Sequence, residues 1–312
     1  MKIIFWGSDD FAQYHLKRLH ISAHKIVACV TKPDRSKGRH LKVVPTPIKD
    51  FALENKIALL QPETLQDPKL IAQLRSLNAD LFVVIAYGKI LPLEVLKIPA
   101  RYAVNVHASL LPKYRGAAPI NWAIINGERA TGITIIRLNE AMDGGDIIAQ
   151  KKHEISSTDT AVTLREKLME EGSTCLLQTL EAIEKNKISF LSQDRSAVTI
   201  APKLTKELGE IDWNKKAEEI HNLVRGLLPW PGAYTYVHGK MLKILGSEFL
   251  PKKDGDPKPG VVSGIDEKGL HIATSKGELV VKRVNLESGR PMDVHSFLRG
   301  HQIKLGEALG KK

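Results

Sequence analysis

Cysteine is scarce in this sequence, and long apolar runs are absent. The only two cysteines in 312 residues, Cys29 and Cys175, indicate buried thiols in a reducing compartment rather than a disulfide framework. No run of about 18 apolar residues occurs, so no transmembrane helix is predicted. Residues 1–7 are too short for a signal peptide and indicate a first strand. The eleven histidines have neither ligand spacing nor companion cysteines, so no metal site is predicted.

The composition is that of a globular protein with an excess of positive charge. Hydrophobic residues make up 43% and charged residues 26%, and the length suits one large or two ordinary domains. The formal net charge is +11, and residues 32–49 concentrate it, with six basic residues and one acidic residue. Such a surface favours a polyanion such as nucleic acid as the partner, although solubility alone also accounts for a basic composition.

Residues 1–190 alternate between strand-like and helix-like segments, which predicts an α/β domain with a doubly wound parallel sheet. Ser8 and Asp9 stand where a dinucleotide-binding turn needs further glycines, so a nicotinamide dinucleotide is not expected, and the acids suit helix capping instead. A break or bend is expected at Gly172 in the last helix. The expected strands lie at 2–6, 25–30, 58–60, 80–86, 103–107 and 132–138, and the expected helices at 11–19, 48–55, 68–77, 117–126 and 158–184.

The pattern changes after residues 191–209, which lack a strong period and indicate a linker. Residues 210–312 begin with a helix expected at 216–228 and stopped by Pro229. Short strands are expected at 233–238, 241–250, 260–265, 270–274 and 278–285, with a last helix at 292–299. About five short strands in some 80 residues predict a small OB-like β-barrel, a fold that often binds nucleic acid.

The stretch 104–145 contains the residues best suited to catalysis. Asn105 and His107 are two apart in an apolar run, so in a strand both side chains emerge from one face. Asp143 follows the strand at 132–138, and two glycines after it let a carboxylate loop approach a neighbour closely. An imidazole base, an amide donor to an oxyanion and an orienting carboxylate suit attack by an amine on a carbonyl-like carbon. An Asn-x-His pair can equally be structural, and spacing alone does not decide between the two.

This stretch resembles the signature of the formyltransferases and hydrolases that depend on N10-formyltetrahydrofolate. That family has an Asn-x-His-x-Ser-Leu-Leu-Pro-x-x-Arg-Gly run and a downstream Asp-x-Gly, and the resemblance covers nearly the whole chain. The matching residues are Asn105, His107, Ser109, Leu110, Leu111, Pro112, Arg115, Gly116, Asp143, Gly144 and Gly145. Ser8 and Asp9 depart from the family's pattern.

The resemblance implies roles for these residues and a formyl-donor co-substrate. It implies that Asn105, His107 and Asp143 are catalytic, and that 10-formyltetrahydrofolate binds without a metal. The main chain at Tyr87 and Gly88 is expected to lie along the pterin. The segment of Ser109, Leu110, Leu111 and Pro112 is expected to frame the folate as well.

The basic loop resembles a second feature of the family. Residues 32–42 are similar to the Asp-Arg-x-x-Gly-Arg loop of the members that formylate methionyl initiator tRNA, which also carry a C-terminal barrel. The resemblance implies tRNA contacts by Arg35, Lys37, Arg39 and Lys42, with Arg39 at the position of the family's key arginine. In the barrel, Trp230, Tyr234 and Tyr236 can stack on bases, although core packing is expected for at least two of them.

The implied reaction therefore moves a formyl group from folate to the α-amino group of methionyl initiator tRNA, in the cytoplasm, by a monomer without membrane contact. Three alternatives stay open. A sugar-amine N-formyltransferase shares the Asn, His and Asp residues but has no use for a basic loop. A formyltetrahydrofolate hydrolase would use water in place of the amine. A catalytically silent RNA-binding protein would have no need of an intact catalytic set.

Overall fold

The computed structural model describes residues 1–37, 42–251 and 258–310, and only the main chain of residues 35–37, 42 and 43. The described residues group into two compact units. The first unit comprises Met1–Pro119, Ala130–Glu154 and Arg165–Ala201. The second unit comprises Ile120–Arg129, Ile155–Leu164 and Pro202–Lys312. Two short segments from the first two thirds of the chain therefore group with the C-terminal residues.

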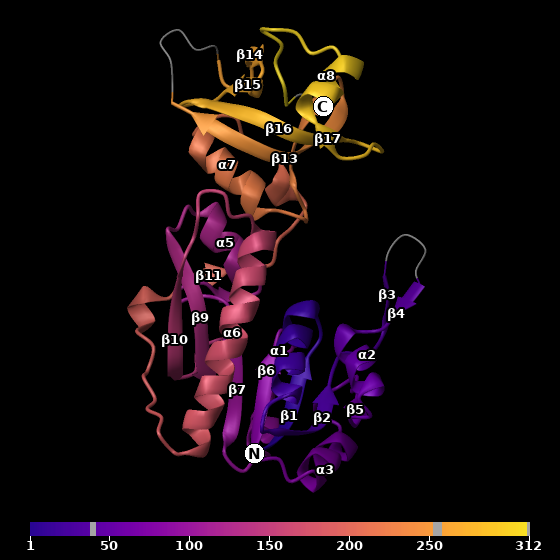
Figure 1. Cartoon of the computed structure of the whole chain (residues 1–312), viewed down its shortest axis with the longest axis vertical. Helices are drawn as coiled ribbons and strands as arrows, with labels where there is room; N and C mark the ends of the chain where they lie inside the picture. The colour runs from indigo at the N-terminus through magenta and orange to yellow at the C-terminus, as the bar shows by residue number, and fades with distance from the viewer. Residues whose placement is uncertain (38–41, 252–257, 311–312) are drawn as a thin grey trace. The chain divides into compact units, whose positions relative to one another are not determined.

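A seven-stranded sheet forms the centre of the first unit (Figure 1). Its strands are β1 (Lys2–Gly7), β2 (Lys25–Val30), β5 (Leu59–Leu60), β6 (Leu81–Ile85), β7 (Tyr102–His107), β9 (Ala130–Arg137) and β10 (Ile147–Glu154). Their order is β10-β9-β7-β6-β1-β2-β5. The strands from β7 to β5 are parallel, as predicted, whereas β9 is antiparallel to β7, and β10 to β9. The prediction of a parallel sheet is therefore wrong for the two strands at this edge, β9 and β10. A loop without a crossover helix joins these two strands, so they pair with each other in the antiparallel direction.

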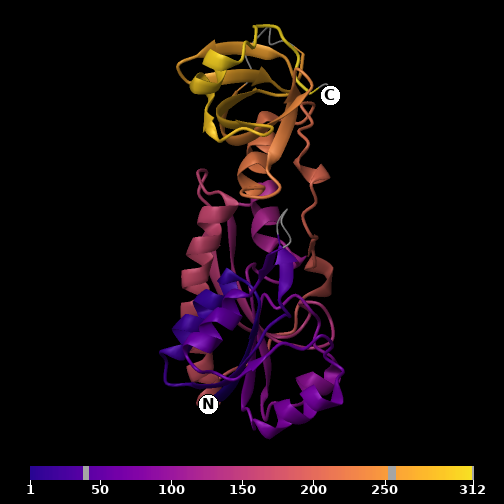
Figure 2. The same ribbon diagram turned by 90° about the vertical axis from the view of Figure 1, so that its right-hand side faces the viewer.

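Helices lie on both faces of this sheet, as the doubly wound prediction requires (Figure 2). The helices are α1 (Asp10–His20), α2 (Pro47–Glu54), α3 (Pro68–Ser76), α4 (Leu93–Leu96) and α6 (Ala161–Glu184). On one face, Trp6 of β1 shares a buried core with Leu70 of α3 and Val95 of α4. On the other face lie α1, α2 and α6. The carboxylate of Asp9 accepts a hydrogen bond from the main-chain N–H of Ala12, which confirms the expected cap of α1.

Gly172 lies in the middle of α6 and does not interrupt it, so the predicted break is wrong. A Cβ atom at this position would lie 2.8 Å from Nε2 of His15 in α1 and 3.2 Å from Cδ1 of Ile133 in β9. A side chain at position 172 would therefore collide with His15 and Ile133. Glycine at this position therefore permits the close packing of α6 against α1 and the sheet.

His15 makes the stability of the first unit dependent on pH. Its imidazole is buried, and desolvation lowers its pKa to about 4, although Nδ1 lies 2.8 Å from the carbonyl oxygen of Phe11. A lowered pKa stabilises the fold above the unfolded value of about 6.5, and this stabilisation is lost as the pH falls towards 4. We expect His15 to remove about 2 kcal/mol from the free energy of unfolding between pH 7 and pH 5. Chemical unfolding of the wild type and of His15→Phe at both pH values measures this, and an equal pH dependence in both proteins would contradict it.

The predicted basic loop contains a short antiparallel hairpin, β3 (Arg35–Lys37) with β4 (Lys42–Val44). Residues 38–41, which include Arg39, lie outside the described residues. Asp34 anchors the base of the hairpin, because its carboxylate lies 2.5 Å from Nζ of Lys49 and accepts a hydrogen bond of 2.8 Å from Nε2 of Gln61. The segment was expected to be a loop because of its Pro and Gly content, and its strands are only three residues long.

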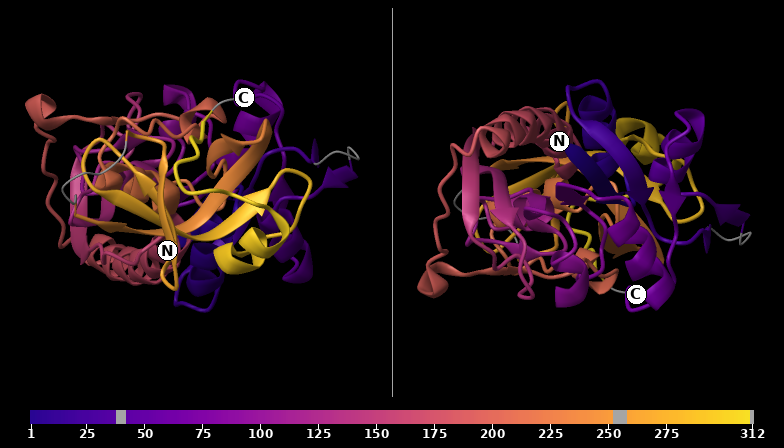
Figure 3. Two further views of the ribbon diagram at one scale, coloured as in Figure 1. Left: turned by 90° about the horizontal axis from the view of Figure 1, so that it is seen from above. Right: turned by 90° about the horizontal axis from the view of Figure 1, so that it is seen from below.

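The second unit is built on an antiparallel sheet in the order β12-β13-β16-β15-β14, with β17 on β16. The strands are β12 (Ala233–Val237), β13 (Lys240–Leu250), β14 (Val262–Asp266), β15 (Gly269–Ala273), β16 (Glu278–Leu286) and β17 (Met292–Asp293), and the helices are α7 (Ala217–Gly226) and α8 (Val294–Gly300). The five predicted strands are confirmed to within a few residues. The strands curl around a common interior (Figure 3), as in the predicted OB-like fold, and Trp213, Ile244 and Phe297 are among the residues that fill it.

Helix α5 (Pro119–Ile125) crosses from the first unit to the second. Within the second unit, Nδ2 of Asn121 donates a hydrogen bond of 2.7 Å to the carbonyl oxygen of Gly226, at the end of α7. A Cβ atom at Gly226 would lie 2.6 Å from Cγ1 of Ile125. The absence of a side chain at Gly226 therefore lets α5 and α7 approach closely.

Residues 191–209 are more structured than the predicted linker. They contain η1 (Arg195–Ala197), β11 (Ile200–Ala201) and η2 (Glu207–Gly209). β11 pairs in parallel with β8 (Arg115–Gly116), and Leu191 forms an antiparallel bridge with Ile147. Main-chain pairing needs no apolar period, so the sequence pattern gives no sign of these contacts.

Both cysteines are buried and unpaired, as predicted. Burial raises the pKa of the Cys29 thiol to about 12 and shifts that of Cys175 in the same direction. Within the described ranges, no helix combines the length and the apolar character needed to cross a membrane.

Candidate functional site

The candidate site begins at the carboxyl end of β7, where Asn105 and His107 lie. Asn105 is opposite Val84 of β6 and Ile136 of β9, and His107 is opposite Thr134 of β9. Because the two residues are two apart in one strand, their side chains leave the same face of the sheet. The strand predicted from the apolar run is therefore confirmed, and it places an amide and an imidazole side by side.

His107 is buried, and both of its ring nitrogens face acceptors. Nε2 lies 2.8 Å from the carbonyl oxygen of Tyr114, which can only accept, so Nε2 carries the hydrogen of that bond. Nδ1 lies 3.6 Å from Oδ1 of Asp143. With Nε2–H held by Tyr114, Nδ1 is the nitrogen that can take up a proton. A proton on Nδ1 would lie beside the Asp143 carboxylate.

The loop that carries Asp143 is held in a specific conformation. Asp143 has φ +49°, in the left-handed region, and its Oδ2 accepts a hydrogen bond of 2.8 Å from the main-chain N–H of Gly116. A Cβ atom at Gly145 would overlap the carbonyl oxygen of Arg137, and one at Gly144 would lie 3.2 Å from Nη1 of Arg115. The prediction that these glycines allow a close approach of the carboxylate loop is therefore confirmed.

Asn105 differs from its neighbours in having an open amide. Its side chain is half-buried, and it makes no hydrogen bond to any residue of the described ranges. Buried amides are usually hydrogen-bonded within the protein, so an open one beside His107 is available to a ligand. Asn105, His107 and Asp143, the candidate triad from here on, therefore offer a donor, a base and a carboxylate.

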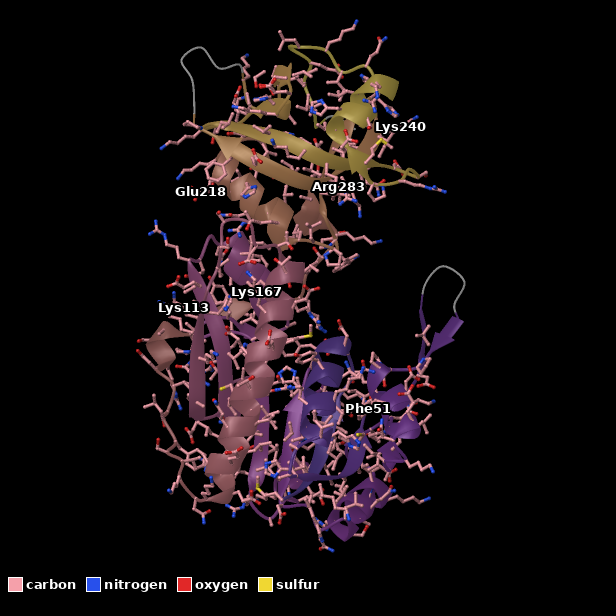
Figure 4. All side chains as sticks on the ribbon, in the orientation of Figure 1. Phe51, Lys113, Lys167, Glu218, Lys240 and Arg283 are labelled. Carbon is pink, nitrogen blue, oxygen red and sulfur yellow. The ribbon has the colours of Figure 1, made fainter. Side chains whose placement is uncertain are left out.

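The segment from Ser109 to Pro112 is fixed from both sides. Oγ of Ser109 donates to the carbonyl oxygen of Lys113 at 2.6 Å, and the exposed side chain of Lys113 is labelled in Figure 4. Thr134 donates to the carbonyl oxygen of Ser109 and accepts from the main-chain N–H of Leu111. Gln150 donates to the carbonyl oxygen of Leu111 at 2.7 Å. Ser109 and Leu111 are buried, whereas Leu110 and Pro112 are partly exposed.

Tyr87 and Gly88 follow β6 at the point where the strand order reverses. β1 leads to β2 on one side, and β6 returns on the other, so the carboxyl ends of β1 and β6 lie at the switch point, the place where such sheets bind ligands. The ring of Tyr87 is buried against Trp6, and burial raises the pKa of its phenol to about 12. Tyr87 is only 1% exposed, main chain included, whereas the next residue, Gly88, is exposed and has φ +74°.

The candidate tRNA contacts are described only in part. Arg35, Lys37 and Lys42 lie on β3 and β4, of whose side chains nothing is described, and Arg39 lies outside the described residues. In the second unit, Trp230 is 51% exposed. Tyr234 and Tyr236 lie half-buried on the outer face of β12, with ring centroids 5.9 Å apart, and are not among the core residues. The expectation that at least two of these three aromatic residues pack in the core is therefore wrong.

Two residues near the candidate triad were not anticipated from the sequence. Gln193 contacts both Arg115 and the Asp143 loop, and Thr199 accepts at Oγ1 a hydrogen bond of 2.8 Å from the main-chain N–H of Tyr114. Both lie in the stretch read as a linker. The partners of these two residues are mostly main-chain groups of residues that are distant in sequence. A periodic pattern of apolar residues does not predict such contacts.

Comparison with known proteins identifies the family. Residues 1–180 match the model of the formyl transferase family, and residues 203–302 match the model of its C-terminal domain. The chain is 43% identical over 311 residues to "Methionyl-tRNA formyltransferase" of Acetivibrio thermocellus, with 100% of both chains covered. It is also 43% identical to the protein of that name from Caldanaerobacter subterraneus subsp. tengcongensis, covering 99% of this chain and 100% of the relative.

Solved structures share the fold at lower identity. A sugar 3N-formyl transferase crystallised with dTDP and 5-N-formyl-THF matches 90% of this chain and 97% of its own, with a TM-score of 0.66 and 20% identity. An N-formyltransferase from Helicobacter canadensis, in complex with folinic acid and dTDP-3-aminofucose, matches 90% and 98% with the same TM-score and 19% identity. With the family model covering more than half of the chain and relatives matching its full length, this chain belongs to the formyl transferase family.

Proposed function

We propose that this chain is a methionyl-tRNA formyltransferase, which transfers the formyl group of 10-formyltetrahydrofolate to the α-amino group of methionyl initiator tRNA and so supports translation initiation. The observation that carries this proposal is the match to relatives of that name over the full length of the chain, at 43% identity. The candidate triad supports it, because formyl transfer to an amine needs a base, an oxyanion donor and a group that stabilises the protonated base.

In the proposed mechanism, the amine attacks the formyl carbon and His107 takes the proton that the amine loses, at Nδ1. Asp143 stabilises the imidazolium that results, and Nδ2 of Asn105 donates to the formyl oxygen as negative charge develops there. The new C–N bond forms while the bond from the formyl carbon to N10 of the folate breaks, and the proton passes from His107 to N10. A free α-amino group has a pKa of about 7.7, so an appreciable minority is already neutral at pH 7.

We place the folate at the switch point formed by the carboxyl ends of β1 and β6. The main chain at Tyr87 and Gly88 would lie along the pterin, and Ser109, Leu110, Leu111 and Pro112 would frame the co-substrate. Two observations fit this: Gly88 is exposed, and the hydrogen bonds of Thr134 and Gln150 hold the second segment rigid. Rigid main chain beside the triad keeps the donor in a reactive orientation.

We assign tRNA binding to the basic hairpin and to the C-terminal residues. In the hairpin region, the proposed contacts are Arg35, Lys37, Arg39 and Lys42. Residues 201–312 carry 19 basic and 14 acidic residues, and exposed cations among them include Lys240 and Arg283, labelled in Figure 4. The proposed division is a catalytic domain at 1–190, a connecting segment at 191–209 and a tRNA-binding domain at 210–312. A monomer acting in the cytoplasm fits a substrate that belongs to translation.

Formyl transfer from labelled 10-formyltetrahydrofolate tests the proposal, with methionyl initiator tRNA and a nucleotide-linked amino sugar offered as acceptors in separate reactions. We expect label on the tRNA alone, and the apparent affinity for tRNA should fall steeply between about 50 and 200 mM salt. Label on the sugar alone would reject the acceptor, while release of formate without an acceptor would point to a hydrolase. No turnover with any acceptor would reject the enzymatic reading.

A further inference from the structure

The carboxamide of Gln193 uses its full hydrogen-bonding capacity at the candidate site. Its Nε2 donates to the carbonyl oxygens of Asp143 at 2.8 Å and Gly145 at 2.7 Å. Its Oε1 accepts from Nε of Arg115 at 3.1 Å and from Nη2 of Arg115 at 2.7 Å. An amide has two N–H donors and an oxygen with two lone pairs, so no capacity is left over. One side chain therefore ties together two segments that are distant in sequence.

The two segments are those that position Asp143 against His107. The first is the loop 143–145, whose two carbonyl oxygens Gln193 holds. The second is the pair Arg115 and Gly116, and the main-chain N–H of Gly116 donates to Oδ2 of Asp143. Asp143 also keeps a left-handed φ of +49°, which costs free energy for a residue with a side chain unless surrounding contacts fix it. Gln193 supplies such contacts directly at the main chain of Asp143.

The charges around the site explain why an amide, rather than a carboxylate, suits this position. Arg115 forms no ion pair with any carboxylate of the described residues, and its partner is the neutral oxygen of Gln193. Asp143 itself carries the negative charge of the loop. Arg137 and Asp146, beside the loop, form an ion pair with each other. A carboxylate at 193 would pair with Arg115, but it would face two carbonyl oxygens without a hydrogen to donate.

We propose that Gln193 is a positioning residue of the formyl-transfer site, whose amide locks the Asp143 loop onto Arg115 and Gly116 and so fixes the distance between Asp143 and His107. The proposal rests on the roles given above to His107 and Asp143. A displacement of about 1 Å at a catalytic group can cost about 10²-fold in rate, so the lock acts on turnover rather than on binding.

The test compares Gln193→Met and Gln193→Glu with the wild type and with Gln178→Met, the same change at an exposed position of α6. For both Gln193 variants we expect kcat to fall by about 10- to 100-fold, with KM for folate and for tRNA changed less than about threefold. Gln178→Met should behave as the wild type does.

A second readout does not depend on activity. The Gly116 amide, bound to Asp143, should exchange hydrogen for deuterium faster in both Gln193 variants than in the wild type and in Gln178→Met. Unchanged exchange and unchanged kcat would overturn the proposal, as would a fall in kcat without faster exchange of the Gly116 amide. If the wild type fails to formylate tRNA, the proposed function fails, whereas the exchange experiment still decides whether Gln193 locks the loop. Should Gln193→Met not fold, Gln193→Glu decides by kcat and exchange, because the carboxylate can still pair with Arg115 but loses both donated hydrogen bonds to the loop 143–145.

Discussion

Replacing His107 by alanine is expected to lower kcat for formyl transfer by at least about 10²-fold, with the affinity for tRNA kept near that of the wild type. The reason is that His107 is the only imidazole of the candidate triad, and Nδ1 is its one position for gaining and losing a proton. The side chain contacts the Tyr114 carbonyl and Asp143, so its loss changes the reacting centre without touching the basic hairpin. Single-turnover kinetics with methionyl initiator tRNA measure the effect.

The matched variant His107→Gln separates chemistry from folding. Its amide can donate to the Tyr114 carbonyl in place of Nε2–H, but glutamine is not a base at neutral pH. We expect His107→Gln to keep the thermal stability of the wild type and to lose as much activity as His107→Ala. Turnover near that of the wild type in either variant would remove His107 from the proposed mechanism.

The second large effect is expected at Asn105. Asn105→Ala should lower kcat by about 10²- to 10³-fold, because a donor to the developing oxyanion is lost, with little change in KM. The Asn105 amide makes no hydrogen bond to the described residues, so its removal leaves no partner unsatisfied. Thermal stability should therefore stay at the value of the wild type, which melting curves of both proteins measure.

Asn105→Asp is the isosteric control for this prediction. It keeps the size of the side chain but replaces the N–H donor by a negative charge that repels an oxyanion. Asn105→Asp should therefore lower kcat at least as much as Asn105→Ala does. A variant with Asp that retains activity would mean that Asn105 contributes shape rather than a hydrogen bond, and its assigned role would be wrong.

The core strands of the fold were predictable where apolar residues follow one another without interruption. Strands β1, β2, β6 and β7 are nearly continuous apolar runs, as strands buried on both faces of a parallel sheet must be. β10 was missed because it is an edge strand. Its sequence, IIAQKKHE, is mostly polar, and only Ile147 in it is buried. Main-chain pairing with β9 holds it, and such pairing leaves no pattern of apolar side chains.

The site was predictable for a different reason. The spacing of Asn105 and His107 and the glycines after Asp143 show which side chains can meet, and the structure brings His107 and Asp143 to within 3.6 Å. The spacing does not show which reaction these side chains catalyse. The resemblance to a family is what implied formyl transfer. Gln193 was not predictable by either route, because its function follows from four hydrogen bonds across 48 to 78 residues of sequence.

The burial of both cysteines has a practical consequence for work with this protein. Thiol reagents react with the thiolate, and the raised pKa values of Cys29 and Cys175 leave almost none of it near neutral pH. A cysteine introduced at an exposed position such as Lys240 (Figure 4) can therefore be labelled selectively in an otherwise unaltered chain. A single dye at that position would report the arrival of RNA at the C-terminal unit by a change in fluorescence, without the removal of either native thiol.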